Sequence, residues 1–442
     1  MSRGTQLELS IERMAYGADA IAHTPEGKTA FVYGAVPGDI VLAEVVREEK
    51  SFLKARTVQV VTPSRERVVP ACPYADVCGG CPWAHMSRAL QLKAKRSSVV
   101  DALVRIGHAD ASQAEALVAQ TEAPSPEWGY RNKIELGCAR QGHQVRIGLH
   151  GADGTSIIKV DSCPLFAAKG KVVKAVSGAL SYLATSHQLD FERIGIRTSQ
   201  HTGQTEVALW TRPAAFPRAQ VAKVLEDALK PNSVVRVMSK GPTKARKIAG
   251  VEVLSGQGFW TERIGGERMY LSAPSFFQVN TKAAEKLQEL VLSGLKPQSS
   301  DVAMDLYCGA GTFTLPLARA CSWVDAVESY GPAVRDLRRN LDAAGLDNAD
   351  PIGGDADLEF PDSDADIIVV DPPRAGLAAS VVDKLSCQKA RAIAYVSCDP
   401  ATLARDLARF RERGVFKPTS ITPVDLFPQT FHVETVVLMS RI

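Results

Sequence analysis

A single cysteine follows a short apolar run near the C-terminus. Ile393 to Val396 are apolar with β-branched members, and charge lies on one side and Asp399-Pro400 on the other. This pattern is typical of a buried strand that ends at Ser397-Cys398. Ligands of open α/β sheets bind beyond the carboxyl ends of the strands. Cys398 is therefore a candidate nucleophile, although free cysteines are also common as plain core residues.

Three further cysteines lie within ten residues and suit a metal or a cluster: Cys72, Cys78 and Cys81. Two glycines between the last two let the backbone fold tightly around a bound group. Thiolates are soft ligands that suit zinc or iron–sulfur clusters. A fourth ligand must come from elsewhere in the chain. We expect Cys163, which shares the Cys-Pro context, and keep Cys138 as the alternative.

A strand, a glycine-containing loop and a helix are expected over residues 301–318. The segment DVAMDLYCGAGTFTLPLA runs through Gly309 and Gly311, which is the unit that binds nucleotide-type cofactors. The next strand ends at Glu328, and acidic residues at about that offset bind ribose hydroxyls. The third glycine of the dinucleotide pattern is missing, so a cofactor without a pyrophosphate fits better. The pattern favours S-adenosylmethionine.

Strands and helices continue to alternate toward the C-terminus. A helix is expected over 331–345, the strand ADIIVV ends at Asp371, Cys398 ends the next strand, and Glu434 lies beside the last one. This alternation predicts an α/β, Rossmann-like domain. The acidic Asp371 and Glu434 thus join Cys398 as candidate site residues.

The front of the chain has a different pattern. Residues Leu7 to Thr62 contain short alternating strands separated by glycines, which predicts a small β-barrel of the oligonucleotide-binding (OB) kind. A helix is expected over 85–107, and residues 127–273 mix strands with a helix over 172–184. No apolar run could span a bilayer and the N-terminus has no apolar signal core, so we expect a soluble cytoplasmic protein.

Charge separates the two parts of the chain. Residues 274–442 contain 17 Lys and Arg against 23 Asp and Glu, whereas residues 1–273 contain 35 against 26. This asymmetry favours a polyanion partner for the front part, although ordinary solvated surface would look similar. Arg236–Lys247 has five basic residues and no acidic one. We expect it to be a loop that contacts phosphate.

Several motifs occur together in a fixed order: FFQVN, DLYCGAGTFTL, VVDPPRAG, VSCDPATLARD and DLFPQTFHVE. On these motifs the chain resembles the class I RNA 5-methyluridine methyltransferases, which include the TrmA (tRNA) and RlmD (ribosomal RNA) branches. The barrel resembles a TRAM domain. The barrel and the cysteines Cys72, Cys78, Cys81 and Cys163 resemble the RlmD branch, which carries a TRAM domain and a 4Fe-4S cluster. One departure is Pro373, where RlmD proteins typically have Ala.

The resemblance implies a function and a set of site residues. The function is S-adenosylmethionine-dependent methylation of a uridine at C5 in RNA, with 23S ribosomal RNA as the expected substrate and a monomer as the expected state. Cys398 would add to C6 of the flipped uracil, Glu434 would remove the C5 proton, and Asp371 would help to position uracil and cofactor. The cofactor pocket would include Gln278, Tyr307, Gly309, Thr312, Glu328, Asp355 and Asp371.

The resemblance also implies a discontinuous domain arrangement. The helix from about Lys93 to Glu122 would pack with the catalytic domain. The expected domains are a TRAM-like barrel over 1–66, a central mixed α+β domain over 67–92 and 123–273, and a methyltransferase domain over 93–122 and 274–442.

Three alternative functions remain at this point. The same chemistry could act on a tRNA uridine, or the chain could be an RNA-binding protein without catalysis. A DNA amino-methyltransferase also carries an Asp-Pro-Pro motif, but it needs no nucleophilic cysteine, so Cys398 argues against it.

Overall fold

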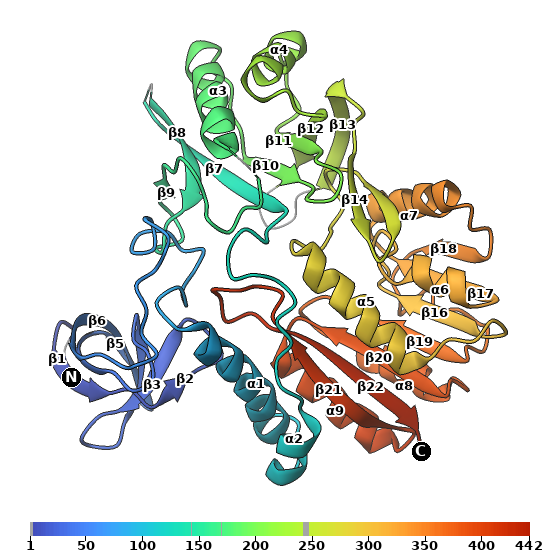
Figure 1. The fold of residues 1–442 in the computed structure, drawn as a ribbon, viewed down its shortest axis with the longest axis horizontal. Helices are drawn as coiled ribbons and strands as arrows, with labels where there is room; N and C mark the ends of the chain where they lie inside the picture. The colour runs from blue at the N-terminus through green and yellow to red at the C-terminus, as the bar shows by residue number, and fades with distance from the viewer. Residues whose placement is uncertain (1–2, 143, 169, 242–246) are drawn as a thin grey trace.

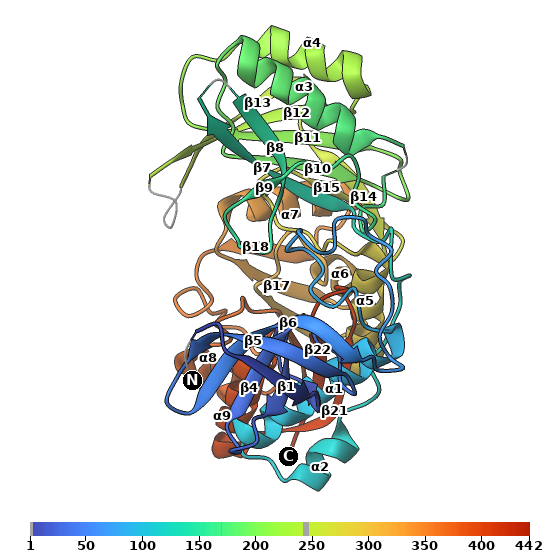
Figure 2. The same ribbon diagram turned by 90° about the vertical axis from the view of Figure 1, so that its left-hand side faces the viewer.

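The computed structural model describes residues 3–142, 144–168, 170–241 and 247–442. It contains an N-terminal β-barrel, a central α+β part and a C-terminal α/β part, with two helices beside the barrel and the C-terminal part (Figure 1). Turned by 90°, the molecule shows the central sheet at one end and the barrel at the other, with the barrel drawn in front of part of the C-terminal α/β part (Figure 2). Within the described ranges, no helix is long and apolar enough to cross a membrane.

The barrel is a six-stranded sheet in the order β1-β5-β6-β4-β3-β2. Its strands have the alternation of buried and exposed side chains that a half-buried strand requires. Two side chains from beyond the barrel, Trp83 and Met86, complete its core. The strands are β1 (Gln6–Ser10), β2 (Arg13–Met14), β3 (Asp19–His23), β4 (Thr29–Tyr33), β5 (Ile40–Glu48) and β6 (Phe52–Thr62).

Helix α1 (Arg88–Arg105) and helix α2 (Ala111–Leu117) follow the cysteine segment. Ser87 caps α1 by accepting a hydrogen bond from the Leu90 backbone N–H, so the helix starts three residues later than expected. The apolar side of α1 packs into the core of the C-terminal part. Residues after α2 then run beside a C-terminal strand, where the Ala119 N–H donates to the Ile421 carbonyl at 2.8 Å.

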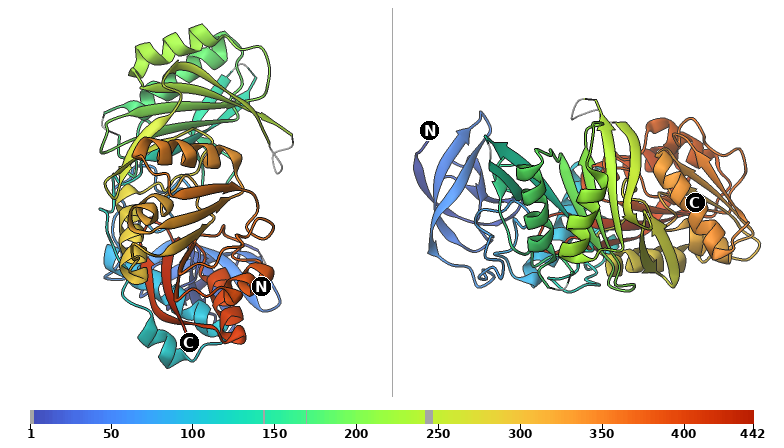
Figure 3. Two further views of the ribbon diagram at one scale, coloured as in Figure 1. Left: turned by 90° about the vertical axis from the view of Figure 1, so that its right-hand side faces the viewer. Right: turned by 90° about the horizontal axis from the view of Figure 1, so that it is seen from above.

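The central part is a seven-stranded sheet in the order β13-β12-β11-β10-β7-β8-β9, with α3 and α4 together on one face (Figures 2 and 3). Helix α3 spans the expected region and buries its apolar stripe against the sheet. The elements are β7 (Lys133–Gln141), β8 (Gln144–His150), β9 (Ile157–Ile158), α3 (Val172–Ser186), β10 (Arg193–Thr198), β11 (Thr205–Thr211), α4 (Arg218–Leu229), β12 (Ser233–Lys240) and β13 (Lys247–Gly256).

The expectation of a phosphate-binding loop at Arg236–Lys247 is wrong for its first residues. Arg236 belongs to β12, is 2% exposed and binds Thr211 Oγ1, Glu252 and two backbone carbonyls. Its guanidinium is therefore buried and bonded within the protein, so it is not placed to contact RNA phosphate. Lys240 and Lys247 are exposed and paired across the two strands, whereas Lys244 and Arg246 lie outside the described residues.

A hairpin, β14 (Trp260–Ile264) and β15 (Glu267–Leu271), leads into the C-terminal part. That part is a seven-stranded sheet in the order β18-β17-β16-β19-β20-β22-β21, in which β22 alone runs against its neighbours. Its elements are α5 (Thr281–Leu295), β16 (Val302–Leu306), α6 (Thr314–Ala320), β17 (Trp323–Glu328), α7 (Gly331–Ala344), β18 (Ala349–Gly353), β19 (Ile367–Val370), α8 (Ala379–Cys387), β20 (Ala392–Ser397), α9 (Pro400–Arg413), β21 (Phe416–Val424) and β22 (Glu434–Arg441).

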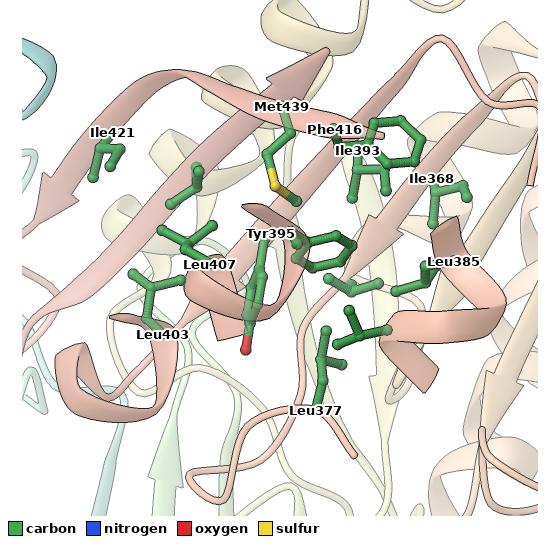
Figure 4. Packing of buried hydrophobic residues seen from close by; sticks show 14 of the residues in the cluster. Ile368, Leu377, Leu385, Ile393, Tyr395, Leu403, Leu407, Phe416, Ile421 and Met439 are labelled. Carbon is green, nitrogen blue, oxygen red and sulfur yellow. The ribbon is translucent and has the colours of Figure 1, made fainter. Parts of the chain in front are cut away.

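Helices cover both faces of this sheet. Helices α5, α6 and α7 pack on one face, and α1, α2, α8 and α9 pack on the other. Figure 4 shows the second face, where Ile393 and Tyr395 of β20 meet Leu403 and Leu407 of α9. Both faces of β20 are buried, which explains its unbroken apolar sequence. The strand order reverses between β16 and β19, and ligands bind at such a point.

Candidate active site and cysteine pocket

Cys398 and Glu434 lie at adjacent ends of two antiparallel strands. Ser397, the last residue of β20, pairs with Thr435 of β22. Cys398 comes immediately after Ser397 and Glu434 immediately before Thr435, so the two residues stand next to one another. Asp399 then caps α9 by accepting hydrogen bonds from two backbone N–H groups, at 2.9 and 3.0 Å. The tight turn between β20 and α9 thus places Cys398 at the carboxyl end of β20.

Burial and acidic neighbours favour the protonated form of this cysteine. Burial, together with Glu434 and Asp371, raises the pKa of Cys398 to about 12, while Arg374 acts in the opposite direction. Glu434 is 4% exposed, and burial and Asp371 raise its pKa well above the ordinary value. Both groups are therefore shifted toward their protonated forms relative to exposed side chains of the same type. A proton must leave before the sulfur can act as a nucleophile.

The carboxyl ends of β16, β17 and β18 bring together the residues expected to bind the cofactor. Tyr307 follows β16 with φ +64°, and burial and then Asp355 raise its pKa to about 12. Glu328 ends β17 and accepts hydrogen bonds from the N–H groups of Gly309 (3.0 Å) and Tyr330 (2.6 Å). Asp355 is exposed, and its Oδ1 accepts from the Asp357 N–H at 2.8 Å.

The carboxyl ends of the central strands β16 and β19 are acidic, and polar atoms without a hydrogen-bond partner are buried in this part of the protein. Burial raises the pKa values of Asp305 and Asp371 to about 7, and Glu328 adds to both shifts. Asp305 Oδ1 and Gln278 Oε1 are buried without a hydrogen-bond partner. Thr312 lies in the turn before α6, where its carbonyl accepts from Gln288 Nε2 at 2.5 Å. Each of these oxygens is free to accept a hydrogen bond from an N–H donor of a ligand.

A second cluster of candidate residues lines a hollow of about 670 Å³ between the cysteine segment, the central sheet and the N-terminal side of α5. Cys72, Cys78, Cys81 and Cys163 all line it, while Cys138 lies in β7 against the central core. Burial, then Cys163, Cys78 and Cys72, raise the pKa of Cys81 to about 12. Within the described residues, no group of three or more His, Cys, Asp or Glu side chains is placed to hold a single metal ion.

The two sites are neighbours. Burial, then Arg374, Lys95 and Arg131, lower the pKa of His432 to about 4. Arg131 also lines the cysteine hollow, and His432 stands two residues before Glu434. A larger hollow of about 870 Å³ lies between β8 and α3, but none of the expected site residues line it.

Known proteins match this chain over its whole length. An RNA methyltransferase of Thermosynechococcus vestitus is 33% identical, covering 99% of this chain and 98% of its own, and one of Gloeobacter violaceus is 34% identical, covering 99% and 97%. A family model described as tRNA (Uracil-5-)-methyltransferase matches residues 261–353 and 354–442, and a TRAM domain model matches residues 2–58. The chain belongs to the RNA (uracil-5-)-methyltransferase family.

This methyltransferase has the fold of a solved relative. The tRNA (uracil-54, C5)-methyltransferase of Pyrococcus abyssi, solved with S-adenosyl-L-homocysteine, superposes with a TM-score of 0.76 at 24% identity, over 98% of this chain and 100% of the other. The expected fold class, a TRAM barrel, a central mixed domain and an α/β methyltransferase domain, is confirmed. The enzyme transfers a methyl group from S-adenosylmethionine to C5 of uracil in RNA.

Sequence reasoning missed several residues of this site. Arg374 affects the pKa values of Cys398 and Glu434, and Tyr16 and His432 also lie close to them. The only sequence signal for Arg374 is its place in VVDPPRAG, directly after the strand that ends at Asp371. Nothing in the sequence around Tyr16 connects it to a residue almost four hundred positions away.

Proposed function

We propose that this methyltransferase modifies one uridine of 23S ribosomal RNA through a covalent bond between Cys398 and C6 of uracil. The observation that carries the covalent mechanism is the register of β20 and β22, which sets a thiol and a carboxyl group side by side. An acid–base pair of this kind can begin and end one addition–elimination cycle.

Uracil C5 is too weak a nucleophile to take a methyl group unaided. Once the Cys398 thiol has lost its proton, addition of its sulfur to C6 breaks the C5–C6 π bond and moves electron density onto C5. C5 would then form a carbon–carbon bond to the methyl group of S-adenosylmethionine as the methyl–sulfonium bond breaks, which would leave S-adenosylhomocysteine. Glu434 removes the hydrogen remaining on C5 as a proton. The electron pair of that C–H bond restores the C5–C6 double bond and expels the sulfur.

S-adenosylmethionine, when bound, supplies an electrophilic methyl group with a positive charge on sulfur. The acidic edge formed by Asp305, Asp371 and Glu328 suits that charge. We assign the unpaired Gln278 Oε1 to an N–H donor of cofactor or uracil. Gly311 has φ +101°, and a Cβ there would lie 2.5 Å from Leu315 Cδ1, so this turn before α6 requires glycine. Nothing lies within 4 Å of a Cβ built on Gly309. Tyr307, Thr312 and Asp355 would complete the pocket.

The four cysteines would hold a 4Fe-4S cluster. Each cysteine of such a cluster binds its own iron atom, so four thiolates around a cubane stand farther apart than the ligands of one ion. All four cysteines line one hollow of about 670 Å³. The cluster would stiffen the segment between the barrel and α1.

The ribosomal substrate is supported by the combination of a TRAM barrel with the four-cysteine pocket, which resembles the ribosomal RNA branch of the family. The test is to map 5-methyluridine in 23S ribosomal RNA and in tRNA from a strain that lacks this gene. Loss at one 23S position, restored by the wild-type gene and not by a Cys398→Ala gene, supports the proposal. Loss in tRNA alone would assign the enzyme to the alternative substrate.

A further inference from the structure

A tyrosine of the barrel reaches the reaction centre. Tyr16 lies in the turn between β2 and β3, far in sequence from the catalytic domain. Its ring meets that of Phe431 edge to face, with centroids 5.8 Å apart. Phe431 stacks in turn on His432 at 4.2 Å and stands three residues before Glu434. The barrel therefore touches the segment that leads directly into the catalytic strand β22.

One tryptophan fixes this contact. The Trp83 indole N–H donates to the Gly17 carbonyl at 3.0 Å, next to Tyr16 in the same turn. The Trp83 backbone N–H donates to the Gln429 carbonyl at 3.1 Å, two residues before Phe431. The Trp83 side chain is fully buried, and its bond to Gly17 is partly buried. The barrel turn and the catalytic loop are thus held by the same residue.

Tyr16, held against Phe431, is close enough to the reacting groups for their charges to act on its hydroxyl group. Besides burial, the charges of Asp399, Cys398, Arg374 and Glu434 act on its pKa, which rises above the ordinary value. These are the groups around the thiol and the base. The side chain nevertheless remains 38% exposed, so part of the ring is open to a ligand.

The chemistry limits what Tyr16 can contact. The sulfur and the methyl group approach C6 and C5 along directions perpendicular to the uracil ring, so the faces of the target base are taken. An aromatic ring beside the site can stack only on another base. The nucleotides that flank a flipped uridine lose their stacking partner, and aromatic side chains replace such partners in RNA complexes.

We propose that Tyr16 stacks on a base adjacent to the target uridine and so holds the target over Cys398. This specificity role rests on the proposed covalent mechanism at Cys398. It also explains why an RNA-binding barrel is clamped to the catalytic loop, since a barrel that moved freely could not position a neighbouring base.

The test combines replacement of Tyr16 with removal of a base that flanks the target uridine, each alone and both together. Single-turnover methylation is measured on a short RNA containing the target uridine, with the flanking base present or replaced by an abasic site on either side. Tyr16→Ala should lower the rate by roughly five- to a hundredfold, the range of base–aromatic stacking. Tyr16→Phe should stay close to wild type, because stacking needs the ring. Removing the stacked base should slow the wild type but cost Tyr16→Ala nothing further.

Tyr33→Ala is the matched control, because Tyr33 belongs to the same barrel and is 40% exposed. It should leave the rate unchanged and so exclude general loss of barrel stability. Three results would each overturn the proposal. The first is that Tyr16→Ala and base removal lower the rate independently and additively at both flanking positions. The others are a Tyr16→Phe variant as slow as Tyr16→Ala, and a Tyr16→Ala variant with an unchanged rate. Failure of the proposed function is seen separately, in wild-type enzyme that does not methylate the RNA at all.

Discussion

At the residue scale, the charges around Cys398 determine when it can react. Burial raises its pKa most, Glu434, Asp371 and Asp399 raise it further, and Arg374 lowers it. A raised pKa means that the group is more protonated at a given pH, so the reactive thiolate is scarce at neutral pH and becomes scarcer as the pH falls. Bound cofactor would change this balance, because its positive charge offsets the carboxylates.

The rate of adduct formation should rise with pH. Between pH 6 and 9, below the pKa of about 12 of Cys398, the thiolate fraction grows by about tenfold per pH unit, and the rate should follow it up to that factor. The measurement is single-turnover formation of the protein–RNA adduct across this range. A rate that falls as the pH rises would contradict the assignment.

Arg374→Gln tests whether the arginine charge tunes the pKa of Cys398. Removing the cation should raise the pKa of Cys398 further and slow adduct formation at every pH in this range. Arg413→Gln, at the far end of α9, serves as the control and should leave the profile unchanged. Equal profiles for all three proteins would show that Arg374 does not tune the thiol.

At the scale of elements, the loop between β21 and β22 is held from four sides. Gln91 and Lys95 of α1 bind Gln429 and the Phe427 carbonyl, and Trp83 binds the Gln429 carbonyl. The Tyr130 hydroxyl donates to the Pro428 carbonyl at 3.1 Å, and Asn280 Nδ2 donates to the Leu426 carbonyl at 3.0 Å. Because Glu434 follows this loop, α1, α5, the cysteine segment and the central domain all help to position it.

Patterns within one strand or helix could be predicted from the sequence, and contacts between distant segments could not. The strand before Cys398 and the helix over 331–345 follow from local apolar periodicity, and the structure confirms them as β20 and α7. Arg236 was misplaced because a basic run looks the same whether its first arginine is exposed or buried against Glu252. Tyr16 was missed because only the docked barrel brings it to Cys398.

The cysteine segment gives a prediction about iron. Anaerobically purified enzyme should be brown and contain about four iron atoms per chain, as a 4Fe-4S cluster requires. Cys163→Ser should lose the iron because Cys163 lines the hollow, whereas Cys138→Ser should keep it because Cys138 lies in β7 away from that hollow. Iron and absorbance are measured for all three proteins. Stoichiometric zinc without iron in the wild type would refute the cluster.

At the scale of the whole molecule, the front part of the chain is basic and the catalytic part is acidic. The excess of Lys and Arg lies in residues 1–273, which include the barrel and the central domain, while residues 274–442 are net negative. Cations on the front part suit the RNA backbone. Negative charge around the catalytic edge suits the cationic cofactor. Trp83, Tyr16 and Phe431 join the two parts near Glu434.

RNA affinity should therefore depend on lysines of the front part. Changing the exposed Lys240 and Lys247 together to Ala should weaken RNA binding and flatten its salt dependence by up to about two charges, because each phosphate contact releases counterions. Cofactor affinity should not change. The control is the pair Lys389→Ala and Lys417→Ala, exposed on the catalytic part, which should leave the slope as it is. The slope of log affinity against log salt is the measurement, and an unchanged slope in the first variant would exclude these lysines.

The covalent cycle is tested most directly by the adduct in a Glu434→Gln enzyme. The amide keeps the shape of the side chain but cannot accept the C5 proton, so the methyl group is transferred and elimination stalls. Incubated with RNA and cofactor, this variant should accumulate a methylated RNA–protein adduct that survives a denaturing gel, with the uridine attached to Cys398 in the digested peptide. Cys398→Ala should form none. Near wild-type turnover by Glu434→Gln, or an inactive variant that never cross-links, would contradict the account.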